Sequence, residues 1–241
     1  MNRYQLSERL QAVSRHVPQG AKLADIGSDH AYLPVYLIEH GMIERAIAGE
    51  INDGPLLSAL ENIKANGFAN QIQAKKGSGL AVLKNEADID TVTIAGMGGP
   101  LIAAILDEGK EHLSTIKRLI LQPNVAADRI RQWLYREGWD LVREEILEED
   151  GHIYEVLVAE PGSGNAAYSA DPNQLEKEIW LGPILMSQKH SAFQKKWKWE
   201  YEQMKRIEDS LSKAKDKEAV SDRLKEVRQK ITWLEEVVSY E

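Results

Sequence analysis

The chain has 241 residues, a net charge of −8 from 30 Lys and Arg against 38 Asp and Glu, and no cysteine. Without cysteine it has no thiol nucleophile, no disulfide and no Cys-based zinc site. The net acidity argues against a generally basic nucleic-acid binder. The start lacks the apolar run of a signal peptide, and no run of 18 apolar residues occurs, so we expect a cytoplasmic protein without a membrane span.

The charge is unevenly distributed along the chain. Residues 1–170 carry 16 basic and 24 acidic side chains, whereas residues 171–241 carry 14 of each. Within the second region, residues 189–206 hold six Lys or Arg and two acids, a local net charge of +4. The acidity therefore belongs to the first two-thirds, and a basic segment lies in the last third.

Short apolar runs alternate with helical stretches between residues 22 and 160. This alternation indicates βαβ units and a parallel sheet, so the fold class is α/β and Rossmann-like. Helices are expected at Leu33–His40, Gly54–Asn66, Pro100–Glu108 and Ala126–Arg136. Strands are expected at Lys22–Ile26, Ala46–Glu50, Gln71–Lys75, Thr91–Ala95, Leu119–Gln122, Trp139–Ile146 and Ile153–Glu160. The last two strands, separated only by a turn at 148–152, predict a terminal antiparallel hairpin.

The pattern changes after a loop of small and turn-forming residues at 161–167. Two apolar seams with spacings of 3 and 4 follow, separated by a polar break at 215–218, which predicts an antiparallel, coiled-coil-like helical hairpin. Its first helix is expected to start near Leu175. We expect two domains, residues 1–165 and 166–241. The seams comprise Met204, Ile207, Leu211 and Ala214, and then Val220, Leu224, Val227, Ile231, Leu234 and Val238.

The segment LADIGSDHAYLP at 23–34 is the most informative part of the chain. A strand ends at an acid, Asp25, and Gly27 then lets a ligand approach the backbone before a helix begins. The next apolar run ends in Glu50, where an acid can accept both hydroxyls of a ribose. Together these features predict a nucleoside-binding site; an ordinary turn with an accidental acid is the alternative.

The identity of the nucleoside cofactor depends on the residues after Gly27. A dinucleotide fingerprint needs further glycines, but Asp29 and Ala31 stand in their places. The carboxylate of Asp29 would oppose a pyrophosphate, whereas it suits the ammonium and sulfonium of S-adenosylmethionine. The sequence therefore favours this cofactor over a nicotinamide dinucleotide.

Three later turns could complete the site. The turn Gly77–Gly79 leaves room for a flat ring, although a plain loop is nearly as consistent. At the fourth strand, Gly96–Gly99 exposes backbone groups at the topological switch, and Met97 either packs on an adenine or belongs to the core. At the fifth strand, Gln122 and Asn124 could bond the edge of a base, or Pro123-Asn124 could simply form a turn.

Metal and hydrolase chemistry find little support in the sequence. No grouping of His, Asp and Glu has metal-ligand spacing, and no Gly-x-Ser-x-Gly elbow is present, so we expect neither a metal nor a hydrolase triad. His30 could contact a substrate or only cap a helix.

The basic segment at 189–206 interleaves cations with aromatic residues and could neutralise phosphates and stack on bases. Phe193 and Trp197, four residues apart, fit a core-facing stripe better, and Trp199 lies off that stripe. The candidate RNA contacts are Lys189, Lys195, Lys196, Lys198, Trp199, Lys205 and Arg206.

Four strings, LADIGSDHAYLP, AGEIN at 48–52, AGMGGPLI at 95–102 and LQPN at 121–124, resemble the bacterial tRNA (adenine-22-N1)-methyltransferase family. The likeness spans the first domain in order and spacing and extends to the helical C-terminal region. It implies a class I methyltransferase fold with a coiled-coil-like C-terminal domain, S-adenosylmethionine as donor, and N1 of an adenine in the tRNA D-arm as acceptor. With its basic face, the C-terminal hairpin would then bind the tRNA. We expect a monomer.

Carried onto this chain, the resemblance implies a set of cofactor contacts. Asp25, Gly27, Ser28 and Asp29 would surround the methionine part, Glu50 with Ile51 the ribose, Gly77, Ser78 and Gly79 the adenine, and Ala95, Gly96 and Met97 the methyl-transfer end. The substrate-side candidates are His30, Tyr32, Gln122 and Asn124, with Asp29 a candidate for stabilising the positive charge of the methylated base. A small-molecule or protein methyltransferase, or a non-catalytic RNA-binding protein with a vestigial fold, remain alternatives.

Overall fold

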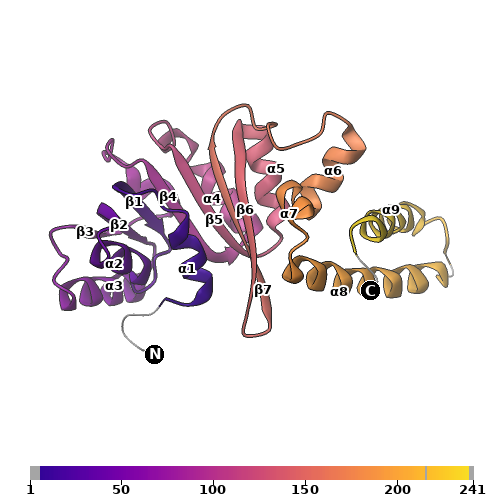
Figure 1. Cartoon of the computed structure of the whole chain (residues 1–241), viewed down its shortest axis with the longest axis horizontal. Coiled ribbons are helices and arrows are strands. Elements are labelled where there is room, and N and C mark those ends of the chain that lie inside the picture. The colour runs from indigo at the N-terminus through magenta and orange to yellow at the C-terminus, as the bar shows by residue number, and fades with distance from the viewer. Residues whose placement is uncertain (1–5, 215, 239–241) are drawn as a thin grey trace. The chain divides into compact units, whose positions relative to one another are not determined.

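Seven strands of the first part of the chain form one sheet (Figure 1). The structure is a computed structural model that describes residues 6–214 and 216–238. The sheet order is β3-β2-β1-β4-β5-β7-β6, with β1 to β5 parallel and β7 antiparallel to both β5 and β6. This confirms the Rossmann-like sheet and its terminal hairpin. The strands are β1 Ala21–Ile26, β2 Ile43–Glu50, β3 Ile72–Lys76, β4 Thr91–Gly98, β5 Arg118–Val125, β6 Trp139–Glu149 and β7 His152–Pro161.

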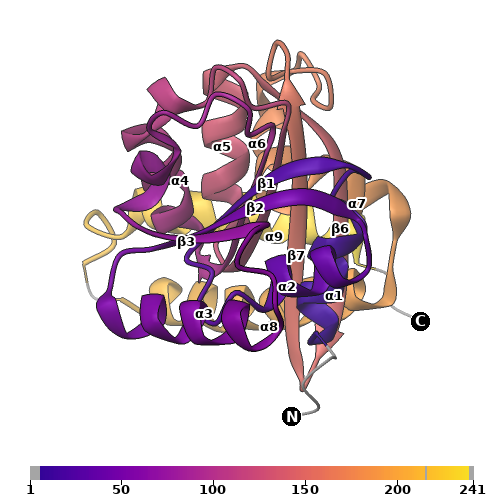
Figure 2. The same cartoon turned by 90° about the vertical axis from the view of Figure 1, so that its left-hand side faces the viewer.

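Helices cover both faces of this sheet (Figure 2). On one face α2 packs against β2 and α3 against β2 and β3, with α1 beside α2. On the other face α4 packs against β4 and β5, and α5 packs against α4 and β6. The central strands are thus buried on both sides, which explains why they read as apolar runs without alternation. The helices are α1 Glu8–Arg15, α2 Tyr32–Glu39, α3 Asp53–Ala65, α4 Gly99–Glu108 and α5 Ala127–Glu137, with short 3₁₀ turns η1 Gly79–Leu83 and η2 Lys110–His112.

Helix α1 was not among the helices expected from the sequence. Ser7 caps it by accepting a hydrogen bond from the backbone N–H of Leu10 at 3.3 Å. Glu149 of β6 accepts a further bond from the N–H of Glu8 at 2.5 Å, which satisfies an N-terminal donor. The second of these caps comes from a residue 141 positions away, which local pattern alone does not reveal.

A buried ionic cluster joins α5 to the terminal hairpin. The side chain of Arg131 has an exposed fraction of 0% and pairs with Glu144 of β6 and Glu155 of β7. Its Nε donates to Glu144 at 2.6 Å. Since a buried charge without a partner is costly, this cluster fixes where α5 lies on the sheet.

The chain divides by its contacts into two units, Met1–Ala167 and Tyr168–Glu241, a boundary two residues beyond the expected one. The second unit contains α6 Pro172–Leu181, α7 Pro183–Gln188, α8 Ser191–Ser212 and α9 Ser221–Val237. One continuous helix starting near Leu175 was expected, and this was wrong. Gly182 adopts a φ of +95° and Pro183 lacks an N–H, so the helix ends there and a second begins. A further break follows at Lys189, with φ +49°.

Helices α8 and α9 run antiparallel and pack against each other. Their direction follows from the pairs Glu208–Arg228 at 2.9 Å and Tyr201–Glu235 at 3.2 Å. The seam is buried only towards the end of α9, at Val227, Ile231, Leu234 and Val238, whereas Met204, Ile207, Leu211 and Ala214 are half-buried. Aromatic rings supply the rest of this core, with the centroids of Trp180 and Trp197 4.8 Å apart. The coiled-coil character of the hairpin stays a prediction.

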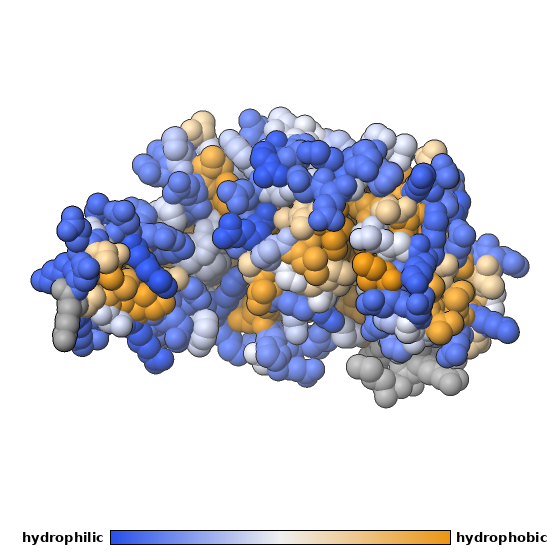
Figure 3. All heavy atoms as spheres, turned by 180° about the vertical axis from the view of Figure 1, so that it is seen from behind, coloured by the Kyte–Doolittle hydropathy of each residue, from blue (hydrophilic) through white to orange (hydrophobic). Residues whose placement is uncertain are grey.

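Apolar side chains on the face seen in Figure 3 form separate patches among hydrophilic ones. Among the described residues, none of the helices is long and apolar enough to cross a membrane.

Candidate active site

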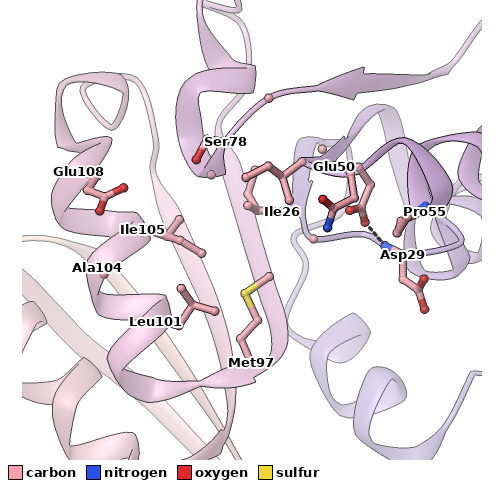
Figure 4. Close-up of a pocket in the computed structure, with 16 residues that line it drawn as sticks. Ile26, Asp29, Glu50, Pro55, Ser78, Met97, Leu101, Ala104, Ile105 and Glu108 are labelled. Carbon is pink, nitrogen blue, oxygen red and sulfur yellow. Dashed lines mark hydrogen bonds between the residues drawn. The ribbon is translucent and has the colours of Figure 1, made fainter.

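A cavity of about 410 Å³ opens at the carboxyl ends of β1, β2 and β4 (Figure 4). Ile26 and Glu50 come from β1 and β2, and Leu101 and Ile105 of α4 line the opposite wall. The turn Gly77–Gly79 after β3 lines it as well. In open α/β sheets this edge is where ligands bind. The cavity is a slot between apolar walls with one buried acidic group, Glu50, beside the exposed Asp29 and Glu108, which suits a flat heterocycle joined to a hydroxylated sugar.

Glu50 is the buried acid of this cavity, with an exposed fraction of 6%. Its carboxylate accepts hydrogen bonds from the backbone N–H groups of Asp29 and Ile51. Burial raises the pKa of Glu50 above its ordinary value of 4.5, and the neighbouring Asp29 and Asp25 charges add to that. The two N–H donors fix the carboxylate, and its remaining lone pairs are available for ligand hydroxyls.

Two glycines keep the cavity walls close to the backbone. Gly27 has a φ of +70°, and a Cβ there would lie 2.2 Å from the Cε of Met97. A Cβ on Gly77 would lie 2.8 Å from Cγ1 of the buried Val82. Gly77 therefore needs glycine for packing, whereas Gly27 needs it for its backbone conformation, since the terminal methyl of Met97 can move aside.

A second cavity of about 420 Å³ adjoins the first. Gly27, Asp29 and Met97 line both cavities, so these three residues mark the junction. The second cavity is otherwise lined by Arg9, Leu10, Asp25, Ser28, Tyr32, Leu33, Ala95, Gly96 and Asn124. Two joined cavities can hold two reactants whose reacting atoms meet at the junction.

Asp25 supports the turn between these cavities. It is 5% exposed and accepts hydrogen bonds of 2.6 Å from the hydroxyls of Ser28 and Thr93. Burial raises the pKa of Asp25, and the two hydroxyl bonds partly offset that rise. The carboxylate thereby ties the end of β1 to β4 and to the following turn.

Side chains at the end of β5 hold the loop after β4. Gln122 accepts from the N–H of Gly96 at 3.0 Å and donates to the carbonyl of Pro123 at 2.8 Å. Asn124 donates to the carbonyl of Gly96 at 2.8 Å and accepts from Nη1 of Arg9 at 3.1 Å. The exposed Asn124 thus lies at the mouth of the second cavity with its amide held on both sides.

Comparison with known proteins identifies the family. A family model described as tRNA (adenine(22)-N(1))-methyltransferase matches residues 23–236. The Bacillus subtilis protein of that name is 47% identical over 240 residues, covering 100% of both chains. This chain belongs to that family. The crystal structure of the B. subtilis m1A22 tRNA methyltransferase TrmK superposes with a TM-score of 0.93, covering 98% of this chain and 100% of that one.

The structure of a second relative contains a ligand. This relative is a putative tRNA (m1A22) methyltransferase of Streptococcus pneumoniae in complex with S-adenosyl-L-methionine. It is 40% identical, with a TM-score of 0.83, and covers 98% of this chain and 100% of that one. Family membership and these likenesses agree with the resemblance found in the sequence motifs.

The twelve residues expected to contact a methyl donor all line one of the two cavities, although their contacts with it stay a prediction. Those at the first cavity or the junction are Gly27, Asp29, Glu50, Ile51, Gly77, Ser78, Gly79 and Met97. Those of the second cavity alone are Asp25, Ser28, Ala95 and Gly96.

The five substrate-side candidates lie in different surroundings. Asp29, Tyr32 and Asn124 line the second cavity. His30 is not among its lining residues and instead stacks on Tyr32 with ring centroids 5.1 Å apart. The expectation for Gln122 needs correction, because its exposed fraction is 0% and both ends of its amide bond the backbone. It holds the loop after β4 and does not reach a substrate.

The basic segment lies mainly on α8 of the second unit. Phe193 and Trp197 have exposed fractions of 1% and 3%, which confirms that they face the core. Trp199 is 63% exposed, so its ring is available to a partner. Of the predicted RNA contacts, Lys189, Lys195, Lys198, Lys205 and Arg206 are exposed and Lys196 is half-buried.

Sequence reasoning missed residues that enter the site from other elements. Arg9 comes from α1, and Leu101 and Ile105 come from the apolar face of α4. Thr93 lies within β4 and contributes a buried hydroxyl. Leu101 and Ile105 are four residues apart, a spacing that indicates one apolar helix face and could have been used to find them. No local pattern in the sequence marked Arg9. Within the described ranges, none of the His, Asp and Glu residues cluster as a metal ion would need.

Proposed function

We propose that this protein is a tRNA methyltransferase that transfers a methyl group from S-adenosylmethionine to N1 of adenine 22 in the tRNA D-arm. The observation that carries the proposal is the pair of cavities joined at Gly27, Asp29 and Met97 in a member of this family. The first cavity offers the slot and buried acid of a nucleoside site, and the second would hold the methionine part of the donor together with the acceptor base. The protein is proposed to act as a cytoplasmic monomer.

The first cavity fits an adenosine. The glycines at its walls leave room for a flat base. The carboxylate of Glu50, fixed by its hydrogen bond from the N–H of Asp29, can accept hydrogen bonds from the two hydroxyls of a ribose. The exposed carboxylate of Asp29 at the junction suits a cationic group better than a phosphate. S-adenosylmethionine supplies an electrophilic methyl group on a sulfonium. These features argue against a nicotinamide dinucleotide, whose pyrophosphate would oppose Asp29.

The chain's own task in the reaction is mainly positioning. N1 of neutral adenine carries no proton and presents an in-plane lone pair, so no general base is needed. Methylation leaves a cationic base, and the carboxylate of Asp29, at the junction, is placed to stabilise the charge that develops. Tyr32, 46% exposed beside the second cavity, offers a ring on which the base can stack. The target nucleotide must leave its stack to expose N1.

The proposal is tested by incubating the protein with unmodified tRNA and S-adenosylmethionine labelled in the methyl group. Label should enter tRNA as 1-methyladenine at position 22, and a transcript with guanosine at position 22 serves as the control. Tight binding of S-adenosylhomocysteine without any labelling of tRNA would refute the acceptor. It would favour a small-molecule or protein substrate, or a vestigial fold.

We further propose that the second unit binds tRNA through the basic face of α8. Lys198→Glu and Trp199→Ala should weaken tRNA binding, because one removes a phosphate partner and the other a stacking platform. Lys225→Glu on α9, where Lys225 is 77% exposed, is the matched control. The salt dependence of binding should fall by about one for each lost phosphate contact. Equal effects of Lys198→Glu and Lys225→Glu would contradict a specific face.

A further inference from the structure

A chain of hydrogen bonds crosses the mouth of the second cavity and joins three elements. Nη1 of Arg9 on α1 donates to Oδ1 of Asn124 at 3.1 Å. Nδ2 of Asn124, at the end of β5, donates to the carbonyl of Gly96 at 2.8 Å. All three residues line the cavity. The oxygen and the nitrogen of the Asn124 amide therefore each have a defined partner of opposite character.

This arrangement selects one of the two orientations of the amide. A side-chain amide has nearly the same shape after oxygen and nitrogen exchange places, so only its partners decide its orientation. In the exchanged orientation, N–H would face the guanidinium of Arg9 and oxygen would face the Gly96 carbonyl, and both contacts would be repulsive. Arg9 and the Gly96 carbonyl together thus give the exposed amide of Asn124 a fixed order of acceptor and donor, and of these two contacts only that of Arg9 is made by a side chain.

Contacts from the terminal hairpin hold Arg9 itself. The backbone N–H of Arg9 donates to Glu149 of β6 at 3.4 Å, and its guanidinium carbon lies 5.2 Å from the ring centroid of Tyr154 on β7. Its Nε is buried and has no hydrogen-bond partner among the described residues. Since buried donors are normally paired, the guanidinium is placed for its contacts with Asn124 and Tyr154 at the expense of Nε.

The held amide matches one edge of adenine. Oδ1 of Asn124 keeps one free lone pair and Nδ2 keeps one free N–H. Asparagine pairs with adenine by accepting from the N6 amino group and donating to N7. That pairing leaves N1, the atom to be methylated, without a hydrogen bond to the protein. Guanine would present an oxygen at position 6 to Oδ1, which is unfavourable.

We propose that Arg9 is a positioning residue that holds the Asn124 amide so that it reads N6 and N7 of the target adenine and leaves N1 free. The inference rests on the proposed function, because it needs an adenine in the second cavity. It assigns to α1, through Arg9, a part in orienting the acceptor base.

The test uses two tRNA transcripts, with adenosine or 7-deazaadenosine at position 22. The analogue lacks only the N7 acceptor, and wild-type kcat/KM should fall about tenfold, as expected for one hydrogen bond. Arg9→Ala should lower kcat/KM for the adenosine transcript about tenfold or more and shrink the penalty for the analogue to less than about threefold. Its affinity for S-adenosylhomocysteine should stay within about twofold of wild type.

Two further variants separate positioning from general damage to α1. Arg9→Lys keeps a donor towards Oδ1 and should restore part of both the rate and the penalty. Arg15→Ala removes another arginine of α1, one that bonds Glu145 and is 55% exposed, and should leave both readouts unchanged. Thermal unfolding of each variant reports whether it is folded. If Arg9→Ala does not fold, the comparison of Arg9→Lys with wild type provides the test.

Each result has a distinct meaning. If Arg9→Ala keeps the full penalty for 7-deazaadenosine, Arg9 does not orient the amide and the inference is overturned. If wild type shows no penalty, Asn124 does not read N7, and the inference is equally overturned. Wild type that binds S-adenosylhomocysteine but methylates neither transcript refutes the proposed function itself.

Discussion

Replacing Glu50 by glutamine should separate ligand affinity from stability. The carboxylate has about four lone-pair sites, and the N–H groups of Asp29 and Ile51 occupy two of them. The two that remain match the two hydroxyls of a ribose. The amide of Glu50→Gln has only one acceptor oxygen and no charge, so it loses one hydrogen bond and weakens the other.

The magnitude follows from hydrogen bonds to charged groups, each of which contributes about 1.5–3 kcal/mol. A net loss of about 2–3 kcal/mol corresponds to a roughly 30- to 150-fold weaker affinity for S-adenosylhomocysteine. Stability should behave differently, because burial raises the pKa of Glu50 and its ionised form therefore opposes folding at neutral pH. The thermal midpoint of Glu50→Gln should equal or exceed that of wild type.

Isothermal titration with S-adenosylhomocysteine and thermal unfolding without ligand measure the two effects. Glu108→Gln is the matched control, since Glu108 lines the same cavity from α4 but is exposed. It should change affinity less than about threefold. An unchanged affinity for Glu50→Gln, or equal losses for the two variants, would refute the assignment of Glu50 to the ribose.

Three further predictions concern the scaffold of the site. Burial raises the pKa of Asp25 above its ordinary value of 3.8, so ionising this group opposes folding. Wild type should therefore lose stability relative to Asp25→Asn as the pH rises from about 4. Parallel profiles of thermal midpoint against pH for the two proteins would contradict this. Arg131→Met removes the cation that pairs with the buried carboxylates of Glu144 and Glu155 and should cost about 3–5 kcal/mol in urea unfolding. A cost below about 1 kcal/mol would show that the guanidinium is not needed. In Gly99→Ala the new Cβ would lie 1.9 Å from the carbonyl oxygen of Ala126, so α4 must shift. The free energy of unfolding should fall by about 1–3 kcal/mol, and S-adenosylhomocysteine should bind more weakly. Unchanged binding would contradict a role of α4 as a fixed cavity wall.

Much of the first unit was determined by local sequence. Strands buried on both faces leave uninterrupted apolar runs, and the helices between them leave amphipathic ones, so all seven strands and helices α2 to α5 could be predicted. The acid and glycine ending β1 and the acid ending β2 are likewise encoded next to apolar runs. These short-range patterns are why the sequence predicts Gly27 and Glu50 as residues of a nucleoside site.

Contacts between distant segments decided the rest. Helix α1 has a local cap, Ser7, and a distant one, Glu149. Arg9 reaches Asn124 from 115 residues away, so its place at the cavity had no local signal. Gln122 and Asn124 are two residues apart and look equivalent in sequence. Strand geometry and packing bury the first completely and leave the second exposed at the cavity.

The second unit shows the same division. The interleaved cations and aromatics of residues 189–206 were visible in sequence, and burial then separated Trp197 in the core from the exposed Trp199. The sequence by itself determined the α/β class and the family and predicted a nucleoside site, because all three depend on short-range patterns. The tertiary structure alone decided which polar side chains reach the cavities, because that depends on burial and on partners brought together from the whole first unit.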